Sequence, residues 1–438
     1  MMLSPRQGMI RKAALLSVIA ASSLVPLFFV RLNEPSFSLN LFKLLAKTGS
    51  LCGTLLLFWQ FLLGYRRAVA RWITSDYLWV IQLHRRLGIG AICLIALHPL
   101  FIIPYYRIKP GLQPLLAALP EPLNLFVPPG ILAFVLLLLI AGSSTLLRSR
   151  LSPRVWYGIH LTSYAVLPLV YLHGFPIGMT LQETGLSKIW MILFVLTAIF
   201  FVFRILGRFG LFDSRYEVVR VTPEGKDTVE ISMKPLRRPL RPGSAQFAFF
   251  RRGIFSPARP FTVSKYEEET GELSITVKDS GRISGQLQKV EAAECFWVDG
   301  PYGVFGREAF YTSRPVVMLA GGIGMTPFRR LITELENLPD RKAYLFYGTS
   351  NEDEIVHRDE MEKTEQVNVI HVLSGTLQHE EFETGQITID LIRKYLDERL
   401  ADCEYFLCGP PPMVTKLEAA LKDQGVSGKQ IHHELFSF

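Results

Sequence analysis

Cysteine is scarce in this 438-residue sequence, which has five cysteines and no C-x-x-C pair. Cys403 and Cys408 have the spacing that opens a plant-type iron–sulfur motif, but the further cysteines that such a motif needs are absent. We therefore exclude an iron–sulfur cluster and a cysteine-ligated zinc site.

Charged residues are sparse before residue 210, and nearly all long apolar runs lie before that point. The net charge of +8 comes largely from Lys and Arg that lie between the apolar runs. The second half has no basic stripe interleaved with aromatic residues, so we expect no binding of nucleic acid. The composition predicts a membrane half followed by a soluble half.

Six apolar segments are each long enough to cross roughly 30 Å of hydrocarbon. They lie near 11–31, 39–64, 78–104, 126–147, 155–175 and 188–207. The first has no small-residue cleavage site after it, so we interpret it as a retained helix and not as a signal peptide.

Basic residues flank these segments mainly on one side. They are Arg6, Arg11, Lys12, Arg66, Arg67, Arg71, Arg148, Arg150, Arg154, Arg204 and Arg208. The other side has little beyond Arg31, Arg107, Lys109 and Lys188. The positive-inside rule therefore predicts a multi-pass protein of the cell membrane with both termini and the soluble half in the cytoplasm.

Histidines occur in pairs at two depths of the membrane half. His84 and His98 lie on the third segment, and His160 and His173 lie on the fifth. Both segments cross in the same direction, so His84 and His160 share one level and His98 and His173 share the other. The fourteen residues from His84 to His98 correspond to ~21 Å and about four turns.

Two facing helices with one imidazole each per level can hold two stacked haems, each iron bound by two histidines. On the fifth segment the two imidazoles lie off a common face of an ideal helix, and a kink at Pro168 would correct this. Gly88, Gly90 and Ala91 are small enough to lie beside a haem. The alternative is a pair of satisfied core histidines, or a proton relay in a transporter.

Residues 215–300 read as short strands separated by turns rich in Gly and Pro, which predicts a small antiparallel barrel. Near its end, Gly281, Ser284 and Gly285 precede an expected helix start, where backbone N–H groups bind a phosphate.

After Pro315 the pattern becomes alternating strands and helices, which implies a parallel sheet. An apolar strand leads into the turn Gly321-Gly322-Ile323-Gly324, which opens a helix, and "CGPPPM" follows downstream. Such a turn lets the backbone approach a pyrophosphate at the helix start.

Four motifs and the histidine spacing together resemble the NADPH oxidase and ferric reductase superfamily, in which a six-helix haem domain is fused to a ferredoxin-reductase-like module. The motifs are "RPFT" (259–262), "GPYG" (300–303), "AGGIGMTP" (320–327) and "CGPPPM" (408–413). The resemblance implies a membrane all-α six-helix bundle over 1–210, an antiparallel β-barrel FAD domain over 211–312 and an α/β Rossmann-like NAD(P)-binding domain over 313–438.

The same resemblance implies FAD, two haem b groups and NADPH or NADH as cofactors. It places FAD against Arg259, Pro260, Phe261 and Thr262, and its pyrophosphate near Lys278, Gly281, Arg282 and Ser284. It places the dinucleotide phosphates at Gly321, Gly322, Gly324, Thr326 and Pro327, and the nicotinamide beside Cys408, Gly409 and Pro410. The terminal Phe438 matches an aromatic residue that stacks over the flavin, and Thr262, Cys408 and Phe438 are the expected catalytic residues. The metal ligands are His84, His98, His160 and His173.

The expected function is transmembrane electron transfer from cytoplasmic NAD(P)H through FAD and two haems to a small acceptor on the outer face, either a ferric chelate or oxygen. Two positions depart from the family, because Arg259 replaces the commoner histidine and Ile102 stands where oxygen-reducing members have a second histidine. Lys43 could supply positive charge near the outer haem instead. The alternatives are a membrane subunit that donates electrons to an extracytoplasmic partner, and a transporter or sensor with a regulatory nucleotide domain.

The choice between NADH and NADPH depends on the end of the second strand of the last domain. Glu352, Asp353 and Glu354 follow that strand and would repel the extra phosphate of NADPH. This acidic run favours NADH, unless it is a solvated loop or Lys416 reaches the phosphate.

Overall fold

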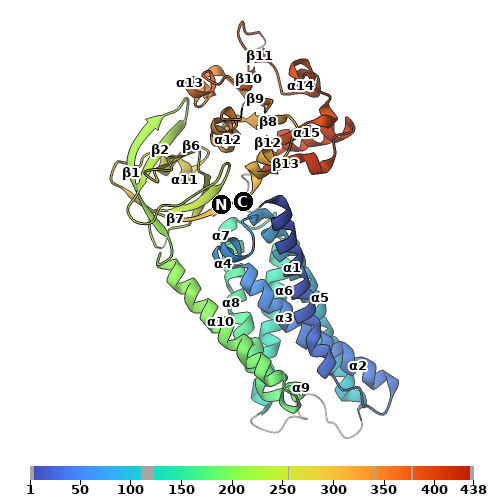
Figure 1. Ribbon diagram of the computed structural model, residues 1–438. Helices are drawn as coiled ribbons and strands as arrows, with labels where there is room; N and C mark the ends of the chain where they lie inside the picture. Colours follow the sequence, from blue (N-terminus) through green and yellow to red (C-terminus); the bar gives the residue numbers. More distant parts are fainter. Residues whose placement is uncertain (1–3, 110–122, 255, 339–340, 376–377, 435–438) are drawn as a thin grey trace. The chain divides into compact units, whose positions relative to one another are not determined.

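The computed structural model describes residues 4–434, apart from 110–122, 255, 339–340 and 376–377. The chain divides into two compact units. One is helical and comprises Ile10–Thr74 and Leu78–Leu206. The other contains the strands and comprises Met1–Met9, Ser75–Tyr77 and Gly207–Phe438 (Figure 1).

Within the described residues, six helical segments are long and apolar enough to cross a membrane. They are Pro5–Phe29, Phe37–Leu63, Tyr77–Ile108, Asn124–Thr145, Pro153–Ile177 and Leu186–Arg208. Each lies over one of the six segments predicted from the sequence. Helices suit this role because they satisfy their own backbone groups in hydrocarbon.

These spans are built from continuous and interrupted helices. Their elements are α1 (Pro5–Leu24), η1 (Val25–Phe29), α2 (Phe37–Lys47), η2 (Thr48–Cys52), α3 (Gly53–Leu63), α5 (Tyr77–Ile108), η3 (Leu123–Phe126), α6 (Val127–Thr145), α7 (Pro153–Leu161), α8 (Ser163–Ile177) and α10 (Leu186–Arg208), with α4 (Arg66–Trp72) and α9 (Met179–Glu183) in connections.

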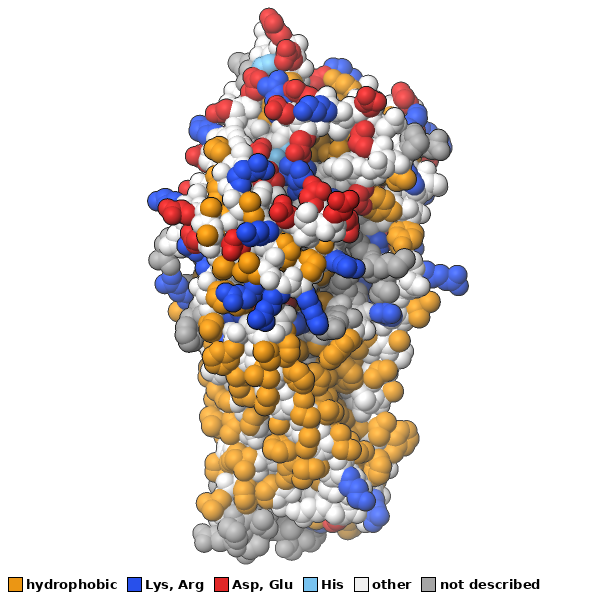
Figure 2. Space-filling view, turned by 60° about the vertical axis from the view of Figure 1, so that its left-hand side comes forward, with side chains coloured by type: hydrophobic (Ala, Val, Ile, Leu, Met, Phe, Trp, Pro, Cys, Tyr) orange, Lys and Arg blue, Asp and Glu red, His pale blue; other side chains and the backbone are white. Residues whose placement is uncertain are grey.

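The outer surface of the helical unit is apolar. Leu132 and Leu139 of α6 and Ile192 and Val202 of α10 are exposed, and Figure 2 shows orange side chains over the face in view. A large contiguous apolar surface of this kind is what contact with lipid requires.

The second span approaches α5 closely at a π-helical turn, Thr48–Cys52. A Cβ atom at Gly49 would lie 2.6 Å from the backbone nitrogen of His98, and one at Gly53 would lie 2.5 Å from Cγ1 of Ile95. The two glycines therefore permit a helix–helix contact that a larger residue would prevent.

The fifth span is interrupted between its two histidines. Helix α7 ends at Leu161, α8 begins at Ser163, and Thr162 donates its hydroxyl proton back to the carbonyl of Ile159 at 2.7 Å. We expected a kink at Pro168, but this residue lies inside the continuous helix α8, and the interruption between the two histidines lies at Thr162.

The first part of the strand unit is a seven-stranded antiparallel sheet with the order β4-β3-β7-β1-β2-β6-β5. Its elements are β1 (Ser214–Pro223), β2 (Thr228–Pro235), β3 (Phe247–Arg251), β4 (Arg259–Thr262), β5 (Lys265–Tyr266), β6 (Leu273–Lys278), α11 (Arg282–Leu287) and β7 (Cys295–Tyr302). Strand β4 also contacts β6, so the sheet curls toward a barrel around Tyr216, Ile231 and Phe296.

The second part is a six-stranded parallel sheet with the order β11-β10-β9-β8-β12-β13. Its elements are η4 (Phe305–Phe310), β8 (Val316–Gly321), η5 (Gly322–Met325), α12 (Thr326–Glu336), β9 (Ala343–Thr349), η6 (Glu352–Glu354), α13 (Arg358–Met361), β10 (Val367–Leu373), β11 (Glu383–Thr384), α14 (Ile389–Tyr395), η7 (Leu400–Asp402), β12 (Glu404–Cys408), α15 (Pro411–Asp423), η8 (Gly428–Gln430) and β13 (Ile431–Glu434). Strands β8 and β12 are buried along their whole length, because separate apolar clusters cover the two faces of the sheet. The predicted fold class is confirmed.

Candidate functional site: paired histidines and a dinucleotide turn

The four membrane histidines form two pairs. The ring centroids of His84 and His160 are 6.3 Å apart, and those of His98 and His173 are 6.2 Å apart. Helix α5 supplies one ring of each pair, and α7 and α8 supply the other. The structure thus brings together the residues that the sequence paired by depth.

This spacing fits a metal bound between two imidazoles. Each nitrogen–metal bond is ~2 Å and each nitrogen lies ~1 Å from its ring centre, so two ligands on opposite sides of one metal place their centroids ~6 Å apart. Both measured separations match this value. Haem iron with two axial histidines has this ligand set.

The pair expected to lie toward the outer face, His98 and His173 (the outer pair), is oriented by backbone carbonyls. Nδ1 of His98 lies 3.2 Å from the carbonyl oxygen of Ala46, and Nδ1 of His173 lies 2.8 Å from that of Phe126. Such bonds fix the tautomer and direct Nε2 toward a metal. Gly130 permits the second bond, because a Cβ atom there would lie 2.5 Å from Nδ1 of His173.

The pair expected to lie toward the cytoplasm, His84 and His160 (the inner pair), is held differently. Nδ1 of both rings is buried and has no hydrogen-bond partner among the described residues. The indole of Trp156 stacks on His160 at 5.1 Å between centroids, and Arg148 lies 4.7 Å from the indole centroid. The sequence analysis missed Trp156, whose only sign was its position one turn before His160.

The small residues expected beside a haem differ in their surroundings. A Cβ atom at Gly90 would meet no atom within 4 Å, as expected. At Gly88 it would lie 3.0 Å from the side-chain nitrogen of Gln60, so this glycine also leaves room for a side chain of the second span. Lys43 is also engaged elsewhere, in a 2.8 Å ion pair with Glu34.

The expected flavin residues lie at the edge of the antiparallel sheet. Arg259 to Thr262 form β4, in which Arg259 is exposed and Thr262 is buried. The hydroxyl of Thr262 has no hydrogen-bond partner among the described residues, so an orphaned polar atom marks the place expected for FAD. The residues therefore fit the cofactor.

The expected pyrophosphate residues are arranged less simply. Lys278 ends β6 and forms a 2.7 Å ion pair with Glu354. Gly281 has φ +155° and precedes α11, which begins at Arg282. Ser284 and Gly285 thus lie inside this short helix and not before it, because Ser284 donates to the carbonyl of Gly281 at 2.9 Å in its first turn.

The dinucleotide turn lies between β8 and α12. Gly321 and Gly324 face the end of β12: a Cβ atom at Gly321 would lie 2.9 Å from Cδ of Pro410, and one at Gly324 would collide with the carbonyl of Cys408. Gly322 has φ +53°. The glycines therefore permit the close approach of the turn to Cys408, Gly409 and Pro410, while Thr326 and Pro327 begin the helix that follows.

Cys408 is fully buried at the end of β12, and burial raises the pKa of its thiol well above the ordinary value. Its neighbour across the β12–β13 pairing is Glu434, whose side chain is also buried and whose Oε2 has no hydrogen-bond partner among the described residues. Burial, and then repulsion from Asp76, raises the pKa of Glu434 to about 8. The sequence analysis missed Glu434, because an acidic residue in a short strand is ordinarily solvated. Phe438 lies outside the described residues.

The acidic residues 352–354 contact other residues of the protein. Glu352 pairs with Arg358, the carbonyl of Asp353 accepts from the backbone nitrogen of Lys226 at 2.8 Å, and Glu354 pairs with Lys278. We predicted that this run faces the ribose. That stays a prediction, and in the structure the two glutamates pair with basic side chains.

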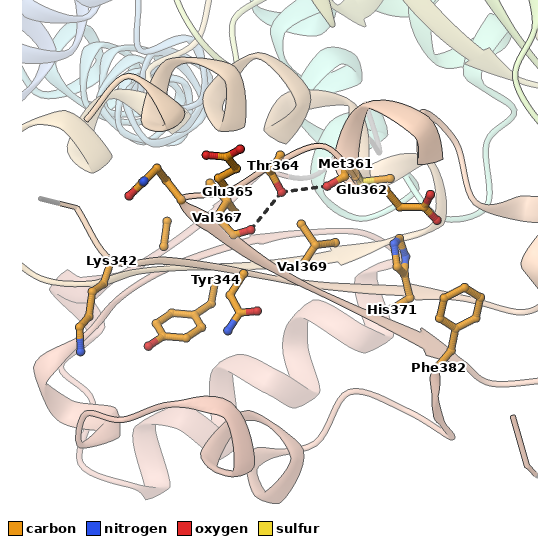
Figure 3. Close-up of a pocket in the computed structure, with 13 residues that line it drawn as sticks. Lys342, Tyr344, Met361, Glu362, Thr364, Glu365, Val367, Val369, His371 and Phe382 are labelled. Carbon is orange, nitrogen blue, oxygen red and sulfur yellow. Dashed lines mark hydrogen bonds between the residues drawn. The ribbon is translucent and has the colours of Figure 1, made fainter. Parts of the chain in front are cut away.

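A cavity of about 590 Å³ lies beside strand β10 (Figure 3). Its wall includes Ala343 and Val367, which begin β9 and β10, together with His371 and Phe382. The dinucleotide turn lies at the opposite, carboxyl ends of the parallel strands, so the cavity is separate from the site.

Two family models match separate parts of the chain. Residues 48–171 match the model described as ferric reductase like transmembrane component, and residues 318–419 match the one described as oxidoreductase NAD-binding domain.

Among curated proteins, NADH-cytochrome b5 reductase 1 of Lodderomyces elongisporus is 29% identical over 179 residues, which are 38% of this chain and 58% of that protein. One component of the Na(+)-translocating NADH-quinone reductase of Haemophilus influenzae is 30% identical over 194 residues, which are 40% of this chain and 47% of that protein. The chain thus spans about half the length of these relatives. The solved flavohemoglobin of Malassezia yamatoensis superposes with a TM-score of 0.46 at 15% identity, covering 99% of this chain and 100% of that one.

The candidate membrane spans and the two family-model matches together indicate a membrane-bound oxidoreductase. More specifically, the chain joins a region similar to the ferric reductase like transmembrane component to a module that contains an oxidoreductase NAD-binding domain.

Proposed function

We propose that this protein transfers electrons from NAD(P)H across the membrane to a small acceptor, with FAD and two haem b groups as resident cofactors. The observation that carries the proposal is the pairing of four histidines at two depths, with ring centroids 6.3 and 6.2 Å apart. A transporter or a sensor has no need of two such pairs.

The residues present suit each cofactor in turn. The paired imidazoles would hold haem iron, which would supply a one-electron couple. Thr262 and its strand would hold FAD, which exchanges a hydride for single electrons. The buried surroundings of Cys408 and Glu434 would exclude water from the nicotinamide.

The direction follows from the basic loops. The Lys and Arg residues that flank the spans favour a cytoplasmic module, and the His98–His173 level then lies toward the outer face. Both curated relatives named above are NADH enzymes by name, which supports NADH as the donor. Ferric chelate and oxygen are the candidate acceptors.

The experiment uses the full chain purified in detergent. We expect about two haems per chain by pyridine haemochrome analysis, anaerobic bleaching of the flavin and reduction of the haem bands by NADH, and reoxidation when ferric chelate or oxygen is added separately. A His98→Ala variant should lose about one haem and keep its FAD. Full haem content in that variant, or a wild-type protein without haem, would refute the proposal.

A further inference from the structure

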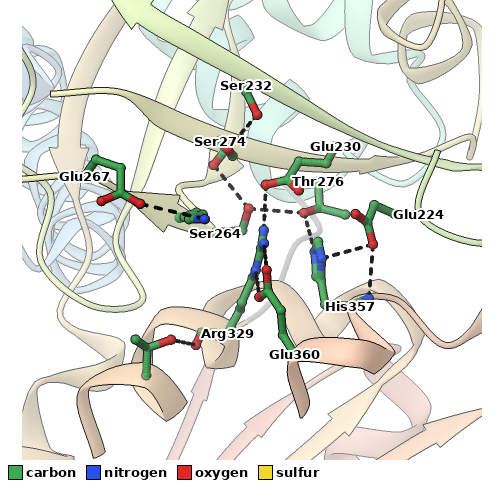
Figure 4. Close-up of polar contacts among 12 residues, drawn as sticks. Glu224, Glu230, Ser232, Ser264, Glu267, Ser274, Thr276, Arg329, His357 and Glu360 are labelled. Carbon is green, nitrogen blue, oxygen red and sulfur yellow. Dashed lines mark hydrogen bonds and ion pairs between the residues drawn. The ribbon is translucent and has the colours of Figure 1, made fainter. Parts of the chain in front are cut away.

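A buried polar cluster joins the nucleotide domain to the flavin barrel (Figure 4). At its centre is Arg329 of α12, which is 6% exposed. Its Nη1 donates to Oε1 of Glu230, on strand β2 of the barrel, at 2.6 Å. Its Nε and Nη2 donate to Glu360, on α13 of its own domain, at 2.7 and 2.6 Å.

A second contact across the same boundary comes from His357. This residue adopts a left-handed backbone conformation with φ +57°, and its side chain is 1% exposed. Nε2 lies 2.9 Å from the hydroxyl of Thr276 on β6, and Nδ1 lies 3.2 Å from the carboxylate of Glu224 after β1. The backbone nitrogen of His357 also donates to Glu224, at 3.3 Å.

The cluster resembles a cation-binding site in which the guanidinium of Arg329 takes the place of a metal ion. One ligand-type atom from each of Glu224, Glu230 and His357 lies within 4.8 Å of the others, an arrangement that could hold a metal ion. The guanidinium of Arg329 already bonds Glu230 there. Because a buried carboxylate without its partner is costly, this cluster strongly favours one placement of the two domains.

The position of Arg329 in the chain connects this polar cluster with the expected nucleotide site. Arg329 lies in the first turn of α12, directly after the glycine turn expected to hold the dinucleotide phosphates. The next residue, Arg330, also reaches the barrel, donating to the carbonyl of Pro242 at 2.6 Å. Helix α12, which begins at the expected nucleotide site, is therefore held by hydrogen bonds to the domain expected to bind the flavin.

We propose that Arg329 and His357 are positioning residues for hydride transfer. They fix the nucleotide turn relative to the flavin strand β4, and so set the approach of the nicotinamide to the flavin ring. This inference rests on the proposed function. It predicts that breaking the contact between Arg329 and the barrel slows hydride transfer, while each domain still binds its own cofactor.

The chain offers a matched pair of variants. Glu230→Gln and Glu360→Gln each remove one carboxylate from the same guanidinium, but only Glu230 belongs to the barrel. Misplacement of reacting groups by ~1 Å can lower a rate by about 100-fold. We therefore expect Glu230→Gln to lower the limiting rate of flavin reduction about 10- to 100-fold, and Glu360→Gln to lower it by less than about 3-fold.

The measurement is anaerobic stopped-flow reduction of the flavin in the full chain, over a series of NADH concentrations. The limiting rate should fall in Glu230→Gln while the apparent dissociation constant of NADH and the FAD content stay near wild type. Glu230→Asp, which keeps the charge, should recover part of the rate. A general structural defect would instead lower FAD content and weaken nucleotide binding together.

Two results would overturn the inference. One is a wild-type limiting rate in Glu230→Gln, and the other is an equal loss in Glu230→Gln and Glu360→Gln. A wild-type protein whose flavin neither NADH nor NADPH reduces would overturn the proposed function itself, and the inference with it.

Discussion

Gly130 of α6 is the position at which one added methyl group should disturb the outer histidine pair. A Cβ atom there would lie 2.5 Å from Nδ1 of His173 and 2.7 Å from its Cγ and Cε1. In a helix interior, Gly→Ala is ordinarily stabilising by about 0.5–1 kcal/mol. At this position, the contact with the imidazole opposes that gain.

The size of the effect follows from the contact distances. Non-bonded atoms of this kind rest about 3.5 Å apart, so the ring must move by about 1 Å. That movement breaks the 2.8 Å bond between Nδ1 and the carbonyl of Phe126. Loss of such a supporting bond typically lowers metal affinity about 10- to 100-fold, which is about 1.4–2.7 kcal/mol.

The assay compares Gly130→Ala with Gly142→Ala. Gly142 lies on the same helix, and a Cβ atom there would meet no atom within 4 Å. We expect haem content per chain to fall toward one in Gly130→Ala, with a shifted midpoint potential for any outer haem that remains. Gly142→Ala should keep two haems, and both variants should keep FAD. Two haems with unchanged potentials in Gly130→Ala would refute the reasoning.

Three further outcomes can be measured on the same protein. Because burial, and then Asp76, raises the pKa of Glu434 to about 8, the folded chain keeps a proton that the unfolded chain loses near pH 4.5. This stabilising contribution is complete below pH 4.5 and is lost as the pH rises to about 8. The stability of Glu434→Gln relative to wild type should therefore rise by up to about 5 kcal/mol across that range, as measured by the thermal release of FAD. A stability difference that does not change with pH would contradict this prediction. Trp156→Leu should alter the electron paramagnetic resonance g-values of one ferric haem, whereas Trp156→Phe should preserve them, since only the leucine removes the ring stacked on His160. Deleting Phe438 should change flavin fluorescence or the hydride-transfer rate, and no change in either would count against a role over the flavin.

Features encoded in short stretches could be predicted from the sequence. Apolar length located the six spans, the histidine intervals paired the rings, and the strand–glycine–helix order located the dinucleotide turn. Each of these is visible within about 20 residues, because helix periodicity and turn chemistry are local properties.

Hydrogen bonds and ion pairs between distant segments could not be predicted. The carbonyl that orients His98 lies 52 residues away in sequence at Ala46, and the one that orients His173 lies 47 residues away at Phe126. Arg329 and Glu230 are 99 residues apart. The contacts of the acidic run 352–354 could not be predicted for the same reason, because its partners Lys226 and Lys278 come from another domain.

The outer histidine level depends on more of the bundle than the inner level does. The third and fifth spans supply all four rings, but the outer rings also take their orientation from the second span through Ala46 and from the start of the fourth through Phe126. Nδ1 of the inner rings takes no such support from the described residues. Loosening the second span by mild heating should therefore dismantle the outer level first, and the two haems of one chain should be released at different temperatures, as separate steps in the Soret absorbance.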